Sequence, residues 1–170
     1  MRAIQENEPE RLKAFCCSGI YTDPASQLPA AQEAALGLRR ASLDEVLAAA
    51  DFLTIHVPLT ASTRGLIGGA AIARLKPGAI VVNTARGGII DENALADALG
   101  SGHVLAAGMD VFEHEPLGPD SPLRTMSNVI LTPHISAGTR DAMRQKMMAI
   151  FANLRRFFAD GRLENRVTFA

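Results

Sequence analysis

The 170-residue chain lacks an excess of charge of either sign and any long apolar run. It has 17 lysines and arginines against 18 aspartates and glutamates, and this balance excludes a strongly basic nucleic-acid-binding surface. No stretch of about 18 uncharged apolar residues is present, so the sequence predicts no span of a membrane. The first ten residues carry three glutamates and no apolar run, which excludes a signal peptide.

Cysteine and nucleophile chemistry are equally restricted. The two cysteines, Cys16 and Cys17, are adjacent, so they form neither a disulfide framework nor a spaced pair of metal ligands. No other His, Cys or Asp set has metal-ligand spacing, and we expect no metal. A G-x-S-x-G elbow and a phosphate-binding lysine loop are also absent. We therefore expect a metal-free protein of the reducing cytoplasm.

The composition and the order of patterns indicate a globular α/β protein. Hydrophobic residues make up 48% of the chain and charged residues 21%, too apolar for a disordered chain. Short apolar runs of strand length alternate with amphipathic stretches, and several are apolar nearly throughout, which predicts parallel strands buried on both faces. The runs cover residues 16–21, 52–57, 79–83, 104–109 and 128–131.

Helical patterns lie between these runs. Ser42 and Glu45 form a capping-box pattern, Asp91 can cap a helix over residues 92–99, and a short helix is expected over residues 70–75. The alternation predicts βαβ units and a doubly wound parallel sheet. The longest helical pattern, over residues 139–159, has one apolar stripe that comprises Met143, Met147, Ile150, Leu154 and Phe158.

Polar, charged or imidazole groups follow each of the five apolar runs. Because ligands bind beyond the carboxyl ends of the strands in an open parallel sheet, these segments are where we expect a site. They are residues 22–24, 56–58, 84–88, 110–116 and 132–134.

Two of these residues point to a nucleotide. Asp23 follows the first run, and an acid at the end of the second strand of a dinucleotide-binding fold accepts hydrogen bonds from the adenosine ribose and repels a 2′-phosphate. This interpretation favours NAD over NADP, and the alternative is an Asp-Pro turn. His56 lies at the end of the run over residues 52–57. A main-chain contact with an adenine is one interpretation of this position, but the pattern is not specific for it.

Three further residues suggest catalysis. Arg86 precedes two glycines, and a guanidinium on such a turn suits bidentate capture of a carboxylate. Glu115 and His134 could form an acid–base pair, in which the carboxylate orients the imidazole and leaves its other nitrogen to exchange a proton with substrate. The alternative for Arg86 is a solvated loop arginine. For Glu115 it is one member of the acidic patch over residues 113–115, and for His134 it is a loop histidine after a proline.

Several long motifs, in order, resemble the D-isomer-specific 2-hydroxyacid dehydrogenases, the family of phosphoglycerate, glyoxylate/hydroxypyruvate and formate dehydrogenases. The resemblance extends from about residue 12 to residue 167. The motifs that carry it are ADFLTIHVPLT, TRGLI, LKPG, NTARGGIID, AGMDVF with Glu115-Pro116 after it, and NVILTPHI.

The resemblance implies roles for the residues after the runs. Arg86 matches the arginine that binds the substrate carboxylate, Glu115 the catalytic glutamate and His134 the general acid/base. Asp23 matches the ribose-binding acid and Asp110 the residue that holds the nicotinamide carboxamide. The implied reaction is reversible hydride transfer between NAD(H) and a small 2-hydroxy or 2-keto acid. Further cofactor contacts are expected at His56, Val57, Pro58, Thr84, Ala85, Arg86, His134, Ser136 and Ala137.

The chain departs from the family near its start. The family places a G-x-G-x-x-G turn about twenty residues before the ribose acid, whereas the first glycine here is Gly19. We therefore expect a Rossmann-like domain over residues 1–138 that is truncated at its N-terminus, its first strand and glycine loop missing. Residues 139–170 match the helix and tail that return to the substrate domain. The missing strand is central in the order 3-2-1-4-5-6, so its neighbours should have open edges.

Three functions follow from this pattern. The first is a working NAD-dependent dehydrogenase completed by a second chain, the second an inactive remnant, and the third an NAD-sensing binding protein. The expected partners are the acid substrate and either a complementing chain or a second copy in a homodimer.

Overall fold

We describe residues 17–23 and 27–164 in a computed structural model of the chain. The chain divides into two compact units, Met1–Pro133 and His134–Ala170. Within the described residues, the strands all belong to the first unit and the second unit contains one long helix. Each unit is treated separately below.

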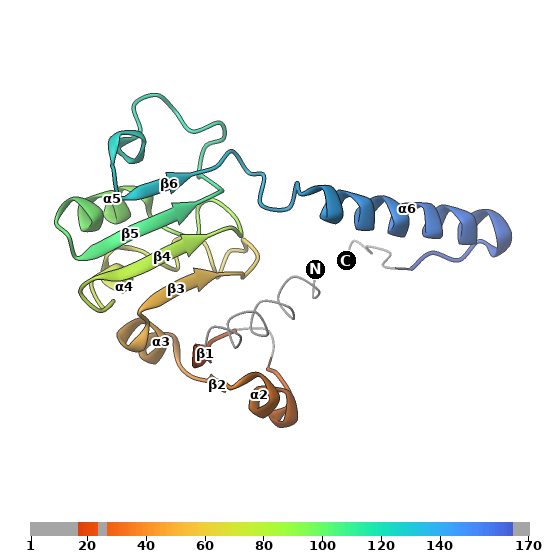
Figure 1. Cartoon of the computed structure of the whole chain (residues 1–170), viewed down its shortest axis with the longest axis horizontal. Helices are drawn as coiled ribbons and strands as arrows, with labels where there is room; N and C mark the ends of the chain where they lie inside the picture. The colour runs from red at the N-terminus through yellow and green to blue at the C-terminus, as the bar shows by residue number, and fades with distance from the viewer. Residues whose placement is uncertain (1–16, 24–26, 165–170) are drawn as a thin grey trace. The chain divides into compact units, whose positions relative to one another are not determined.

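A four-stranded parallel sheet forms the larger part of the first unit (Figure 1). Its order is β3-β4-β5-β6, so strands that follow one another in the sequence are neighbours in space. Phe52 lies opposite Ile80, and a register shift follows Ala79 in the pairing of β4 with β5. The strands are β3 (Phe52–Ile55), β4 (Ala79–Asn83), β5 (Val104–Met109) and β6 (Val129–Leu131).

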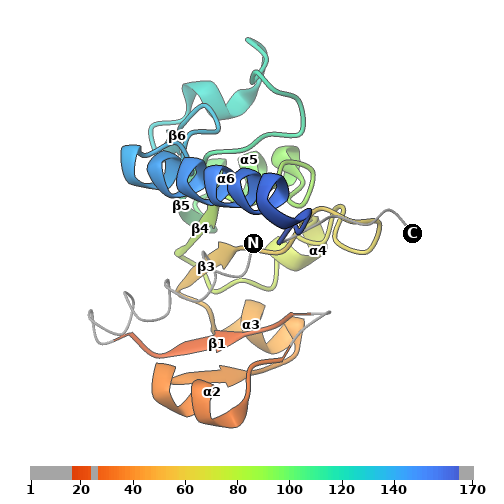
Figure 2. The same ribbon diagram turned by 90° about the vertical axis from the view of Figure 1, so that its right-hand side faces the viewer.

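A separate two-stranded parallel sheet precedes it in the chain. β1 (Gly19–Tyr21) and β2 (Leu38–Arg40) are connected by helix α2 (Ala30–Leu36), which ends at Gly37 in the left-handed conformation. In both views β1, not β2, is the strand nearer to β3 (Figures 1 and 2). The described part of the chain contains no pairing between β1 and β3, so the two open edges predicted from the sequence are present.

The helices of the larger part begin where the capping residues predict. Ser42 and Glu45 form a complete capping box at the start of α3, and Asp91 accepts the N–H groups of Asn93 and Ala94 at the start of α5. The helix expected over residues 70–75 is shorter and ends three residues earlier, before a turn. The helical elements are α3 (Leu43–Ala49), α4 (Gly69–Ile72), α5 (Glu92–Gly100) and the 3₁₀ helix η1 (Pro122–Thr125).

The hydrophobic core lies on one face of the four-stranded sheet. Leu53 and Val81 from the strands pack with Leu95 from α5, and all three are buried. On the other face, Phe52 is 69% exposed and Ile130 is 74% exposed. The expectation that the strands are buried on both faces is therefore wrong for this sheet, because the described helices cover only one face.

The second unit contains α6 (Arg140–Asp160), which begins at the N-cap Thr139 and ends before Gly161 in the left-handed conformation. The hydroxyl oxygen of Thr139 accepts the N–H of Ala142. The helix matches the predicted one within a residue at each end. All five predicted positions of its apolar stripe are exposed: Met143, Met147, Ile150, Leu154 and Phe158.

Candidate functional site

The loops after β3, β4, β5 and β6 lie together at the carboxyl edge of the four-stranded sheet, because its strands are parallel (Figure 1). Starting from the gap between the two sheets, β1 and β2 follow each other in one direction, and β3, β4, β5 and β6 follow one another in the other direction (Figures 1 and 2). The chain order therefore reverses at this gap. Such a reversal is the usual position of a ligand crevice in an open α/β sheet. The predicted residues of the first unit follow these strand ends.

The loop after β3 carries three of the predicted cofactor residues, His56, Val57 and Pro58. The Nε2 atom of His56 lies 2.8 Å from the hydroxyl of Thr54. The hydroxyl of buried Thr63 donates to the carbonyl of Pro58 at 2.6 Å, which fixes the first turn of the loop.

The same loop is hydrogen-bonded to the one that follows β4. Gly65 N–H donates to the carbonyl of Gly88 at 2.8 Å, and Ile67 N–H donates to that of Ile89 at 3.0 Å. The two loops are therefore held side by side at the edge of the sheet.

Asn83, the last residue of β4, fixes the loop that carries Thr84, Ala85 and Arg86. Its side chain is buried, its amide oxygen accepts the N–H of Ala85 at 3.0 Å, and its Nδ2 donates to the carbonyl of Arg86 at 3.0 Å. The guanidinium of Arg86 is exposed and donates to the carbonyl of Ala85 at 2.6 Å. The main chain at Arg86 is thus held by a buried amide, while its guanidinium is at the surface.

Gly87 brings this loop against the one that carries Glu115. A Cβ atom on Gly87 would lie 1.8 Å from the carbonyl oxygen of Phe112 and 2.7 Å from the nitrogen of Glu113, so only glycine fits. Phe112 N–H in turn donates to Oε1 of Glu115 at 3.0 Å. Arg86 and Glu115 therefore come from adjoining loops. Along the chain, Arg86 is one residue and Glu115 three residues from the contact of Gly87 with Phe112.

Asp110 connects three strand ends. It is buried, its N–H donates to the carbonyl of Asn83 at 3.0 Å, and its Oδ1 accepts the hydroxyl of Thr132 at 2.5 Å. A buried carboxylate with such partners is fixed in position. The predicted nicotinamide-binding residue is thus a rigid part of the site.

Glu92 adds a second carboxylate near Glu115. Its Oε1 accepts the N–H of Glu113 at 2.6 Å, and burial raises the pKa of Glu92 above its ordinary value of 4.5. Sequence reasoning assigned no role to Glu92, Asn83 or Thr132. Asn83, at the end of an apolar run, and Thr132, in the segment after the last run, had a recognisable signal, whereas Glu92 had none.

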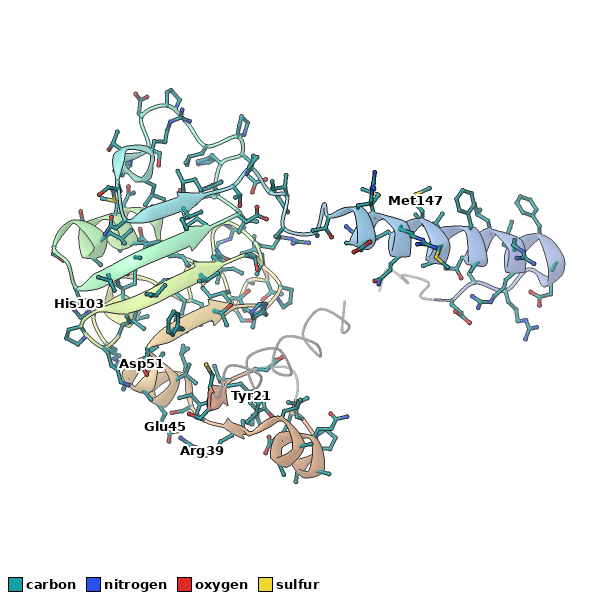
Figure 3. All side chains as sticks on the ribbon, viewed as in Figure 1. Tyr21, Arg39, Glu45, Asp51, His103 and Met147 are labelled. Atoms are coloured by element: carbon teal, nitrogen blue, oxygen red, sulfur yellow. The ribbon has the colours of Figure 1, made fainter. Side chains whose placement is uncertain are left out.

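Asp23 lies in the two-stranded part, just after β1. Arg40 donates to the carbonyl of Asp23 at 3.1 Å and to the side chain of Gln27 at 2.8 Å. The hydroxyl of Tyr21 donates to Glu33 at 2.6 Å and accepts from the N–H of Leu28 at 2.9 Å (Tyr21 is labelled in Figure 3). The chain on both sides of residues 24–26 is therefore anchored to β1, α2 and β2.

The remaining predicted residues belong to the second unit. His134 begins this unit and has a φ of 54°, in the left-handed region. The carbonyl of Ala137 accepts from Nζ of Lys146 at 3.0 Å, and Ser136 precedes it in the same turn. The convergence of His134 with Arg86 and Glu115 stays a prediction.

Two titratable residues lie away from this edge. Asp51 and His103 lie just before β3 and β5, at the opposite ends of the strands (Figure 3). Asp51 pairs with Lys76 at 2.9 Å, and His103 Nε2 lies 3.1 Å from the carbonyl of Ile72. Among residues 17–23 and 27–164, no group of three acidic, histidine or cysteine side chains could hold a metal, and no helix could cross a membrane.

A parallel α/β sheet with its polar loops at the carboxyl edge and a reversal of chain order is typical of a dinucleotide-binding domain. The family described as D-isomer specific 2-hydroxyacid dehydrogenase, NAD binding domain, matches residues 4–136. The chain belongs to this family.

Known relatives agree with this membership. D-3-phosphoglycerate dehydrogenase of Mycobacterium leprae is 51% identical over 132 residues, which are 78% of this chain and 24% of that protein. Glyoxylate/hydroxypyruvate reductase B of Salmonella paratyphi B is 51% identical over 65% of this chain and 34% of its own length.

A solved structure extends the likeness to the fold. D-mandelate dehydrogenase of Rhodotorula graminis superimposes with a TM-score of 0.84 at 36% identity, over 91% of this chain and 45% of that one. The chain thus spans a quarter to a third of the curated relatives and less than half of this solved one.

Proposed function

We propose that this chain supplies the NAD-binding and catalytic half of a dehydrogenase that interconverts a small D-2-hydroxy acid and its 2-keto acid. The observation that carries the proposal is the contact of Gly87 with Phe112, which joins the loop of Arg86 to the loop of Glu115. Both residues stand in motifs of a family to which the chain belongs. The named relatives act on acids of this kind, as their names state.

Each catalytic residue has a chemical task in this proposal. Arg86 binds the substrate carboxylate through its exposed guanidinium, which can move from the Ala85 carbonyl to a stronger, bidentate acceptor. His134 gives a proton to the substrate carbonyl oxygen during reduction and takes it back during oxidation. Glu115 orients the imidazole and stabilises its charged form.

The backbone of His134 supports its assignment. Among the residues that the structure describes, it is the one non-glycine residue with a positive φ. A side chain other than glycine in this region costs about 1–3 kcal/mol, and such residues cluster at functional sites. The strained residue is also the one that the family motif assigns to proton transfer.

The chain's own residues fit a nicotinamide dinucleotide. Buried Asp110 offers a fixed carboxylate to the carboxamide, and Asp23 would accept the ribose hydroxyls and repel a 2′-phosphate, which is why we propose NAD rather than NADP. His56, Val57, Pro58, Thr84 and Ala85 line the same edge, with Ser136 and Ala137 after His134. When bound, the nicotinamide supplies or accepts the hydride.

The proposal includes a partner and a domain division. The G-x-G-x-x-G turn of the family is absent from residues 1–170, so the groups that bind the diphosphate would have to come from outside these residues. We propose a complementing chain, or a second copy in a homodimer, as a partner. We propose residues 1–138 as the cofactor part and residues 139–170 as the segment that contacts a substrate domain. The adjacent cysteines suit a reducing compartment, and we propose the cytoplasm.

The test is NADH oxidation with glyoxylate and with hydroxypyruvate, alongside a fluorescence titration of NADH. It uses the full chain, alone and mixed with the part of the M. leprae relative that precedes the matched region. We expect turnover in the mixture, a loss of about 10²–10⁴-fold in His134→Ala with NADH binding retained, and no loss in the control His103→Ala.

Two other results would contradict the dehydrogenase. NADH binding without turnover, with a partner protein captured only in its presence, would support an NAD-sensing role instead. The absence of NADH binding at millimolar concentration in the mixture would indicate an inactive remnant.

A further inference from the structure

Asp110 directly follows β5, the strand between β4 and β6 in the sheet (Figure 1). Its main chain is held from the β4 side, because its N–H donates to the carbonyl of Asn83 at 3.0 Å. Its side chain is held from the β6 side, because Oδ1 accepts the hydroxyl of Thr132 at 2.5 Å. The terminal torsion of an aspartate has no sharp preference, so a main-chain hydrogen bond does not fix where the carboxylate oxygens point. The hydroxyl of Thr132 acts on this direction.

Thr132 is itself a well-fixed donor. Leu131 lies opposite Met109 in the pairing of β5 with β6, and Thr132 N–H donates to the carbonyl of Met109 at 3.0 Å. Thr132 therefore makes hydrogen bonds to two consecutive residues at the end of β5, one from its main chain and one from its side chain. Its branched Cβ leaves few conformers of the first side-chain torsion. The position of the hydroxyl thus follows from the pairing of the strands.

The hydrogen bond from Thr132 to Asp110 has the geometry of a strong one. Its O···O distance of 2.5 Å is typical of a hydroxyl that donates to an ionised carboxylate, and such bonds are about twice as strong as neutral ones. Asp110 is 2% exposed, so water is a poor substitute for a lost donor. Because a carboxylate is planar, a fixed Oδ1 also sets the direction of Oδ2.

We propose that Thr132 is a positioning residue, whose hydroxyl orients the Asp110 carboxylate so that Oδ2 accepts an N–H of the nicotinamide carboxamide. This inference rests on the proposed function, which gives Asp110 its task at the carboxamide. Thr132 acts through Asp110 and touches neither the cofactor nor the substrate in this role. Its loss should therefore weaken binding of the nicotinamide half of the cofactor and leave binding of the adenosine half, proposed at Asp23, unchanged.

A purely structural role for Thr132 makes a different prediction. If the hydroxyl only satisfies a buried carboxylate and so stabilises the sheet, its removal should affect both halves of the cofactor alike. ADP-ribose separates the two roles, because it has the adenosine, the diphosphate and the second ribose of NADH and lacks the nicotinamide. A positioning role lowers the affinity for NADH alone, whereas a structural role lowers the affinity for both ligands.

The test is calorimetric titration of NADH and of ADP-ribose into the full chain, in the presence of the part of the M. leprae relative that precedes the matched region. Thr132→Val removes the hydroxyl and nearly keeps the shape of the side chain, whereas Thr132→Ser keeps the donor. We expect the valine variant to bind NADH about tenfold more weakly and ADP-ribose within about twofold of the parent chain. The serine variant should bind both ligands like the parent chain.

Three controls accompany these variants. Thr125→Val removes an exposed hydroxyl that donates to the carbonyl of Pro122, before the amino end of β6, and should change neither affinity. Circular dichroism checks folding, and Thr132→Ala, which also lacks the donor, replaces the valine variant if that variant is unfolded. In a chain that already carries Asp110→Ala, Thr132→Val should lower the NADH affinity no further, because Thr132 acts through Asp110.

The outcomes separate this inference from the proposed function. Equal NADH affinity of Thr132→Val and the parent chain, or an equal loss of NADH and ADP-ribose affinity, would overturn the role of Thr132 and leave the dehydrogenase intact. A selective loss of NADH affinity without turnover by the parent mixture would support the role of Thr132 and contradict the dehydrogenase. A parent mixture that binds neither ligand would overturn both.

Discussion

The two sheets of the first unit differ in how they are held together. The four-stranded part contains all the buried residues described in that unit, the first of which is Val46, and its loops are joined by hydrogen bonds from buried Asn83 and Asp110. The two-stranded part has no buried residue among those described: Ile20 of β1 packs, partly buried, against the same core, and hydrogen bonds such as that of Tyr21 to Glu33 join its own elements.

The residues of the candidate site are therefore held in place in two different ways. Arg86, Asp110 and Glu115 lie on loops that a packed core holds in place, whereas Asp23 lies on a pair of strands that has no core of its own. The geometry proposed for substrate binding is therefore preorganised, whereas the geometry proposed for ribose binding rests on the less buried two-stranded part. Substitutions in the four-stranded part should therefore lower the free energy of unfolding more than substitutions in the two-stranded part.

Truncation of a core side chain should have the largest effect. Leu95→Ala removes a fully buried side chain of α5 and should lower the free energy of unfolding by about 2–5 kcal/mol. Ile20→Ala, in the half-buried β1, should cost less than about 1.5 kcal/mol. Urea unfolding measures both, and equal losses would contradict the contrast between the two sheets.

Removal of the buried amide should have the next largest effect. Asn83→Ala leaves Ala85 N–H and the Arg86 carbonyl without their partner and should cost about 1–3 kcal/mol. Faster exchange of the Ala85 amide should accompany it. Asn128→Ala, at the other end of the sheet, is the control, and no change at Ala85 in either variant would refute the role of Asn83.

Loss of a helix cap should cost about 1 kcal/mol. Asp91→Ala removes the acceptor for the N–H groups of Asn93 and Ala94, whereas Asp91→Asn retains an acceptor oxygen and should cost only a few tenths. Circular dichroism with urea unfolding compares the two. If the alanine and asparagine variants were equally stable, Asp91 would not stabilise α5 as a cap.

The smallest effect concerns pH. Burial raises the pKa of Glu92, so its contribution to stability is full below the ordinary value of 4.5 and is lost as the pH rises through the folded-state pKa. Glu92→Gln removes this loss, and its stability relative to the parent chain should rise with pH from 4.5 toward neutrality. Urea unfolding at several pH values is the measurement, and a relative stability that falls with rising pH would contradict the assigned direction.

Local patterns predicted much of this fold. The bounds of β4 and β5 are as predicted, because each is an apolar run that a polar residue ends or follows, and α6 lies within a residue of the predicted helix at each end. β2 was missed because two of its three residues are arginines, so no apolar run marks it. α2 was missed although proline precedes it and glycine follows it.

The site was predictable only in part. Arg86, Asp110 and Glu115 could be located because they follow strands and stand in long motifs. The hydrogen bond from Thr132 to Asp110, the contact of Gly87 with Phe112 and the burial of Glu92 could not, because each joins segments whose approach depends on the packed sheet. Burial on both faces failed as a prediction for the same reason, since it depends on elements elsewhere in the fold.

The most direct test is a fluorescence titration of NADH into the full chain, with and without the part of the M. leprae relative that precedes the matched region. The account predicts that NADH binds about 100-fold more tightly in the mixture, because residues 1–170 lack the family's diphosphate-binding turn and the added polypeptide is expected to carry it. Equal affinity with and without the added polypeptide would contradict it.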